Sequence, residues 1–289
     1  MKKILFPLTV ALTLLTTATA QDVSKLRIYI NPGKGGWGPD DRPKETISHP
    51  NTYQSESDLY LPDTCGFYES NTNLWKAQKL GKKLIDAGFK PENILYSRTA
   101  NGPYPYNPDS PDKNKYSRSL TEIAEEVEAN NIDLYLSIQH NNNREGSRIN
   151  HPLFIFRGKD GEGNDCVQGS YEIAKTIWPL FYTNAIDPTT SYSPANPNIR
   201  GDFDYFGMTK QRTDPTSGKT YEGYLEDMMH GAKGITVESS FASYQPSRHR
   251  ELNRDYCGQE GVRYARGIIK FFGARTDTKG YIMGTVKDQ

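Results

Sequence analysis

The chain has 289 residues, and its 35 basic residues balance its 35 acidic residues. This length suffices for one large domain or two small ones. The balanced charge argues against a polyanionic partner, so no nucleic acid is expected. Tyrosine is used heavily, with 19 copies; exposed tyrosines often stack on sugars, although buried tyrosines are more common.

The first twenty residues have the pattern of a secretory signal peptide. Lys2 and Lys3 form a basic start, residues 4–15 form an apolar run, and residues 18–20 (ATA) form a small-residue cleavage pattern. The apolar run is too short to be a stable membrane anchor. We therefore expect residues 1–20 to be removed and residues 21–289 to be secreted or periplasmic, without a membrane span.

Hydrophobic periodicity predicts strands that alternate with helices along the mature chain. The expected strands cover residues 25–30, 94–96, 132–138, 152–156 and 234–237. The expected helices cover residues 69–88, a segment that opens at the capping box 119–122, and residues 171–182 and 254–272; Pro179 is expected to kink or shorten the third. Residues 37–66, 101–112 and 186–220 lack periodicity and are expected to be irregular. The alternation predicts a single α/β domain with a mainly parallel sheet flanked by helices.

Three cysteines follow the signal segment: Cys65, Cys166 and Cys257. Secretion permits a disulfide, but three cysteines cannot all pair within one chain. No CxxC pair is present, which argues against a cysteine zinc site. We expect either one disulfide with one buried thiol, or three buried thiols.

Polar groups end strands or begin a helix at one edge of the expected sheet. Lys34 follows the first strand, Gln139 and His140 follow the third, Glu238 follows the last, and Glu69 opens the first long helix. Ligands of such sheets bind at the carboxyl ends of the strands. Chain order therefore predicts that these residues converge.

Four short segments resemble motifs of zinc-dependent N-acetylmuramoyl-L-alanine amidases, in that family's order. The corner resembles NPGHGG or DPGHGG, and the other segments resemble a glutamate-bearing helix start, an SIHxN strand end and a last strand that carries a glutamate. The segments are NPGKGG (31–36), YESNTNL (68–74), LSIQHNN (136–142) and TVESSF (236–241). DDR (40–42), FRG (156–158) and SFASY (240–244) resemble a branch common in secreted Bacteroidetes proteins. The resemblance extends from about residue 26 to about residue 273, and four motifs in order are more specific than any one alone.

The resemblance implies a defined hydrolytic chemistry. In that family two histidines and a glutamate hold Zn²⁺ and leave a position open for water. The metal lowers the pKa of the water and polarises the amide carbonyl, and a second glutamate moves the proton toward the leaving amine. The bond that is cut joins the lactyl group of N-acetylmuramic acid to the L-alanine of the stem peptide.

This chain departs from the motif at two of the three ligand positions. Lys34 stands where the resemblance places the first histidine, and Gln139 stands where it places the second. Glu69 matches the glutamate ligand, and Glu238 matches the catalytic glutamate. An ammonium cannot bind zinc and an amide oxygen is a weak zinc ligand. We therefore expect no zinc cofactor, and expect Lys34 to pair with Glu69 as an internal positive charge.

His140 offers an alternative ligand. Strand residues alternate between faces, so His140 is expected to point away from the Gln139 side. A bulge at the strand end would turn it inward, and zinc would then be held by Glu69 and His140.

Three classes of function follow from these observations. The first is a degenerate amidase-like protein that binds peptidoglycan or another glycan without cleaving it. The second is an active enzyme, either an amidase with a rearranged zinc site or another hydrolase that uses Glu69 and Glu238. The third is an interaction protein that uses residues 186–220. Glu238 also has a structural interpretation, as a cap of the turn after its strand.

Overall fold

The computed structural model describes the chain in several separate segments. The described residues are 22–34, 69–101, 118, 120–143, 149–182, 192–205, 211–213, 220–222, 231–244, 247 and 250–274. The expected signal peptide, the expected loop 37–66, residues 102–112, Ser119 of the capping box and Cys65 lie outside these ranges.

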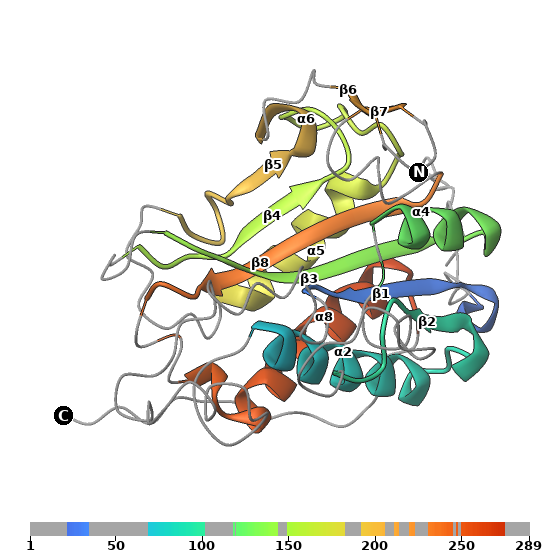
Figure 1. Ribbon diagram of the computed structural model, residues 1–289, viewed down its shortest axis with the longest axis horizontal. Coiled ribbons are helices and arrows are strands. Elements are labelled where there is room, and N and C mark those ends of the chain that lie inside the picture. Colours follow the sequence, from blue (N-terminus) through green and yellow to red (C-terminus); the bar gives the residue numbers. More distant parts are fainter. Residues whose placement is uncertain are drawn as a thin grey trace, which may run out of the picture.

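A six-stranded sheet forms the centre of the fold, in the order β2-β1-β3-β8-β4-β5 (Figure 1). All neighbouring pairs are parallel except β4 and β8, which are antiparallel. The mainly parallel sheet predicted from the sequence is therefore confirmed. The strands are β1 (Ile28–Pro32), β2 (Ile94–Tyr96), β3 (Leu134–Asn141), β4 (Leu153–Phe156), β5 (Ile199–Gly201) and β8 (Lys233–Phe241). A separate antiparallel pair is formed by β6 (Gln211–Thr213) and β7 (Thr220–Glu222).

Helices cover both faces of this sheet. One apolar cluster joins Leu136 and Ile138 of β3 to Leu80, Ile177 and Ile268 of three helices. A second cluster, on the opposite face, joins Tyr29 and Tyr135 to the helix that carries Ile123 and Val127. The helices of the first face are α2 (Glu69–Asp86), α5 (Ser170–Tyr182) and α8 (Arg254–Phe271), and the helix of the second is α4 (Leu120–Ala129). Short elements complete the described fold: η1 (Val23–Lys25), η2 (Pro91–Asn93) and α6 (Asp202–Tyr205).

Several predicted boundaries are corrected by the structure. The first strand begins at Ile28 rather than Lys25, because Asp22 accepts a hydrogen bond from the Ser24 amide and caps a 3-10 turn. β3 and β8 continue three and four residues past their predicted ends, so Gln139, His140 and Glu238 lie within strands. Pro179 does not shorten α5, which runs on to Tyr182.

The stretch 186–220 was predicted to be irregular, and this is wrong for part of it. It contains β5, α6 and β6. β5 pairs with β4 at the edge of the main sheet. Three- and four-residue elements carry too little periodicity to be recognised in a sequence.

Of the two described cysteines, Cys166 is exposed and Cys257 is buried. The expectation of three buried thiols is therefore wrong at Cys166. No helix within the described ranges combines the length and the apolar character needed to cross a membrane.

Candidate functional site

The corner after β1 carries Lys34 and lies against the end of β3. The Gly33 amide donates to the Ile138 carbonyl at 2.9 Å. A Cβ atom on Gly33 would lie 2.0 Å from Nε2 of Gln139, so only glycine allows the Gln139 amide to lie against this corner. Lys34 itself has a φ of 61°, a conformation that is uncommon for residues other than glycine. Such strain persists where surrounding contacts enforce it, often at functional sites.

Arg98 holds this corner against the start of α2. Its guanidinium donates to the carbonyls of Pro32 at 3.0 Å, Gly33 at 3.1 Å and Ser70 at 2.8 Å. The side chain is buried, and charge-assisted hydrogen bonds are among the stronger ones. Arg98 therefore fixes the distance between the lysine corner and the helix that carries Glu69.

Glu69 lies between Lys34 and the end of β3. Its Oε2 is 3.9 Å from Nζ of Lys34, and its Oε1 accepts a hydrogen bond of 2.8 Å from the His140 amide. Asn73, one turn along α2, donates to the same carboxylate at 3.5 Å. Burial raises the pKa of Glu69, and Lys34 and the hydrogen bonds oppose this rise. The contacts thus favour the ionised form of a carboxylate that burial disfavours.

Gln139 and Glu238 are opposite one another on β3 and β8. Gln139 donates to the Ser137 hydroxyl at 3.1 Å. Oε2 of Glu238 is buried and has no hydrogen-bond partner among the described residues. Burial raises the pKa of Glu238 to about 8, with a further contribution from Glu69, while Lys34 acts in the opposite direction. Glu238 is therefore mostly a neutral acid near pH 7, able to donate a hydrogen bond.

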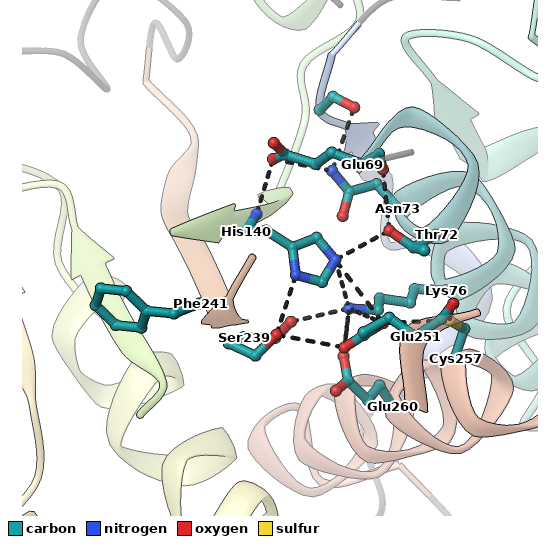
Figure 2. Close-up of polar contacts among 12 residues, drawn as sticks. Glu69, Thr72, Asn73, Lys76, His140, Ser239, Phe241, Glu251, Cys257 and Glu260 are labelled. Carbon is teal, nitrogen blue, oxygen red and sulfur yellow. Dashed lines mark hydrogen bonds and ion pairs between the residues drawn. The ribbon is translucent and has the colours of Figure 1, made fainter. Parts of the chain in front are cut away.

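The His140 side chain lies among buried polar groups of α2 and β8 (Figure 2). Its Nε2 is 3.0 Å from the Thr72 hydroxyl and 3.1 Å from Nζ of Lys76, and its Nδ1 is 3.1 Å from the Ser240 hydroxyl. A lysine ammonium only donates, so Nε2 accepts and Nδ1 carries the proton. Burial and then Lys76 hold the pKa of His140 well below its usual value, so the ring is neutral. The strand register shifts between Gln139 and Asn141, as the alternative zinc site required. This shift does not turn the His140 ring toward Glu69, because the ring contacts Lys76.

Lys76 is a buried charge that the sequence analysis missed. It contacts His140, Ser239, Glu251 and Glu260, and we call these five residues the Lys76 cluster. One signal was available: Lys76 lies four residues before Leu80, on the same buried stripe of α2, where a lysine requires buried partners.

Tyr205, at the end of α6, was also missed. Tyr205 is 39% exposed, and its side chain hydrogen-bonds to Asn141, the last residue of β3. Burial raises the pKa of Tyr205, and the nearby Glu238 carboxyl adds to the rise. α6 is anchored by buried Asp202, which accepts a hydrogen bond of 2.9 Å from the Gly158 amide. An exposed aromatic side chain thus lies at the rim of the site.

The structure therefore brings together Lys34, Glu69, Gln139 and Glu238, at the carboxyl ends of β1, β3 and β8. Contacts between them link the corner, the start of α2 and two strand ends. The His140 backbone joins this group through Glu69 while its ring faces the Lys76 cluster.

No protein-family model matches the chain, and no curated protein matches it. Solved structures do. Cwp6 from Clostridium difficile is 17% identical with a TM-score of 0.54, and the match covers 85% of this chain but only 29% of Cwp6. The N-acetylmuramoyl-L-alanine amidase AmiC2 of Nostoc punctiforme is 15% identical with a TM-score of 0.53, covering 85% and 96% of the two chains. Ami1 from Mycobacterium smegmatis, also an N-acetylmuramyl-L-alanine amidase, is 13% identical with a TM-score of 0.54, covering 88% and 99%. The chain thus has the fold of these amidases.

The residues at the site do not fit the zinc ion that the resemblance implies. An ammonium, an amide and one carboxylate occupy the three positions, and an ammonium has no lone pair for a metal. Across the described ranges, no group of three or more His, Cys, Asp or Glu side chains is arranged to hold a metal ion.

Proposed function

We propose that the chain is a secreted amidase-like protein that binds peptidoglycan or a related glycan without cleaving it. The ion pair between Lys34 and Glu69 carries this proposal. It sets a tethered cation beside the carboxylate that the resemblance assigns to zinc. A tethered ammonium neutralises the carboxylate but cannot activate water as a metal ion does.

The remaining site groups suit a polar, uncharged ligand. The neutral Glu238 carboxyl donates a hydrogen bond, and the Gln139 amide both donates and accepts. Tyr205 adds an exposed aromatic side chain at the rim, and tyrosine combines an apolar ring with a polar tip. Hydroxyl and acetamido groups of a glycan match these partners, and the ring of Tyr205 would lie against a sugar face.

The proposal is tested by a paired binding and digestion assay on purified sacculi. We expect the folded protein to co-sediment with sacculi and to release no stem peptides, with or without added zinc. A zinc amidase of this fold, treated identically, provides the positive control for release. Absence of co-sedimentation by a protein with a cooperative unfolding transition would contradict the proposal.

An active peptidoglycan amidase with a rearranged metal site is the alternative. The raised pKa of Glu238, about 8, favours it, because a carboxyl that is protonated near neutral pH suits a general acid. In that case the His140 ring, which contacts Lys76 in this structure, would have to turn toward Glu69 for the two residues to hold zinc. Stoichiometric zinc in the purified protein, together with release of stem peptides, would establish this alternative.

Secretion and domain organisation are part of the same proposal. Residues 1–20 would be removed as a signal peptide, leaving 21–289 as one amidase-like α/β domain. Amino-terminal sequencing of the exported protein tests this, and a mature protein that retains residues 1–20 would contradict it.

A further inference from the structure

We infer that Lys76 is the positioning residue of the candidate site, because its ammonium fixes both strand ends that carry Gln139 and Glu238. Lys76 lies on the face of the sheet opposite to the one toward which the Gln139 and Glu238 side chains point. That this arrangement serves ligand binding rests on the proposed function. The positioning of the strand ends by Lys76, and the experiment that tests it, do not depend on that function.

The two residues that Lys76 contacts on the sheet each follow a site residue directly. Its Nζ is 3.1 Å from Nε2 of His140 and 2.9 Å from the Ser239 hydroxyl. His140 follows Gln139 on β3, and Ser239 follows Glu238 on β8. Successive strand residues point to opposite faces. One ammonium therefore holds the two strands together directly behind the paired site residues.

The ammonium itself is held in place by two carboxylates. Its Nζ is 3.0 Å from Oε2 of Glu251 and 2.7 Å from Oε2 of Glu260, and the lysine side chain is 0% exposed. Burial alone would lower the pKa of Lys76, but these carboxylates outweigh it and raise the pKa well above its usual value. A charge that is buried and enclosed in this way is costly to move. Lys76 is thus a fixed reference point for the strand ends.

The same network reaches Glu69. The Thr72 hydroxyl donates to the Glu69 carbonyl at 3.1 Å and lies 3.0 Å from Nε2 of His140. The His140 amide donates to the Glu69 carboxylate at 2.8 Å. His140 is therefore held at its ring by Lys76, and its backbone in turn holds Glu69 (Figure 2).

Amide hydrogen exchange, measured by NMR on the glycan-free protein, tests this inference. Ser239→Ala removes one contact of Lys76 and leaves the buried charges in place. Lys76→Met removes the ammonium. Thr236→Val is the matched control: Thr236 is on β8, is buried, and its hydroxyl has no hydrogen-bond partner among the described residues.

We expect Ser239→Ala to speed exchange of the His140 amide about tenfold or more relative to that of Leu136 in the centre of β3. Lys76→Met should do so more strongly, and Thr236→Val should leave this ratio unchanged. A role in stability alone would speed both amides equally, and that outcome in Ser239→Ala would overturn the inference even if Lys76→Met does not fold. If the wild-type protein does not bind glycan, the proposed function is contradicted, but the hydrogen-exchange result for Lys76 still stands.

Discussion

Lys34 and Glu69 form an ion pair at 3.9 Å, between the corner that follows β1 and the first residue of α2. The two side chains are 24% and 15% exposed, so solvent screens the pair only in part. In zinc amidases, by the resemblance, a metal ion neutralises the corresponding glutamate. Here the neutralising charge is covalently tethered, and the Gln139 amide lies against the same corner.

The first prediction concerns metal content. We expect the wild-type protein to be metal-free by elemental analysis after purification in zinc-containing buffer. Lys34→His with Gln139→His should gain about one zinc per chain, because Glu69 remains and three ligands suffice for a zinc site with an open position.

A triple variant that adds Glu69→Ala provides the control, because it removes the remaining native ligand and should lose the gained zinc. Stoichiometric zinc in the wild-type protein would show that the ligand positions are assigned to the wrong residues.

The second prediction concerns pH and Glu238. Its pKa in the folded protein is about 8, above the usual 4.5, so the folded state binds this proton more tightly than the unfolded state. Its contribution to stability is fully present below pH 4.5 and is lost as the pH rises through 8. Glu238→Gln has no carboxyl to ionise at this position, so the stability of the variant does not fall in this way as the pH rises. Since each pKa unit corresponds to about 1.4 kcal/mol, the variant should be more stable than wild type at pH 8 by roughly 4 kcal/mol.

Urea unfolding at pH 5 and pH 8 measures this difference. The advantage of Glu238→Gln should be larger at pH 8. Glu162→Gln, at an exposed position on the surface, is the control and should shift stability by no more than about 0.5 kcal/mol at either pH. An equal effect of Glu238→Gln at both pH values would show that Glu238 ionises normally.

The sequence predicted much of the fold because its signals were local. The strand at 94–96 and the start of α2 at Glu69 are where periodicity placed them. The ends of β3 and β8 were placed too early, at Ile138 and Val237, where the apolar pattern stops. These strands continue because Gln139 still pairs with Glu238, and the apolar pattern stops there because both side chains belong to the site.

The Lys76 cluster could not be predicted in the same way. Lys76 and Glu251 are 175 residues apart in the chain, and α2 and α8 meet only in the folded protein. A lone lysine on an apolar stripe indicates that a buried partner exists, but it does not identify the partner. Tyr205 was missed for a different reason: it ends a four-residue helix, which is too short for a periodic signal.

The third prediction concerns Tyr205 and glycan binding. Tyr205→Ala should weaken binding to soluble peptidoglycan fragments about tenfold, because stacking of a base on an aromatic side chain, a related contact, is worth about 1–3 kcal/mol. Tyr205→Phe keeps the ring and should bind within about fivefold of wild type, since a typical hydrogen bond contributes about 1 kcal/mol. Isothermal titration calorimetry measures both.

Ile85→Ala is the matched control, because Ile85 is similarly exposed, at 39%, and lies on α2. It should bind as wild type does. Equal affinity of Tyr205→Ala and wild type would exclude Tyr205 from the binding surface while leaving glycan binding itself intact.

The last prediction concerns the charge balance of the Lys76 cluster. Lys76→Met leaves Glu251 and Glu260 buried without their cation, and removing one partner of a buried ion pair typically costs about 3–5 kcal/mol. Burial and Glu260 already raise the pKa of Glu251 to about 7, whereas Lys76 lowers it. Without Lys76 the folded protein binds carboxyl protons still more tightly, so the destabilisation should grow as the pH rises from 5 to 8.

Adding Glu251→Gln to Lys76→Met should recover part of the lost stability at pH 8, because one of the two buried negative charges is gone. Lys82→Met, which removes an exposed partner of Asp86, should cost no more than about 1 kcal/mol at either pH. Equal unfolding free energies of Lys76→Met and Lys82→Met would show that the cluster carries no net charge interaction.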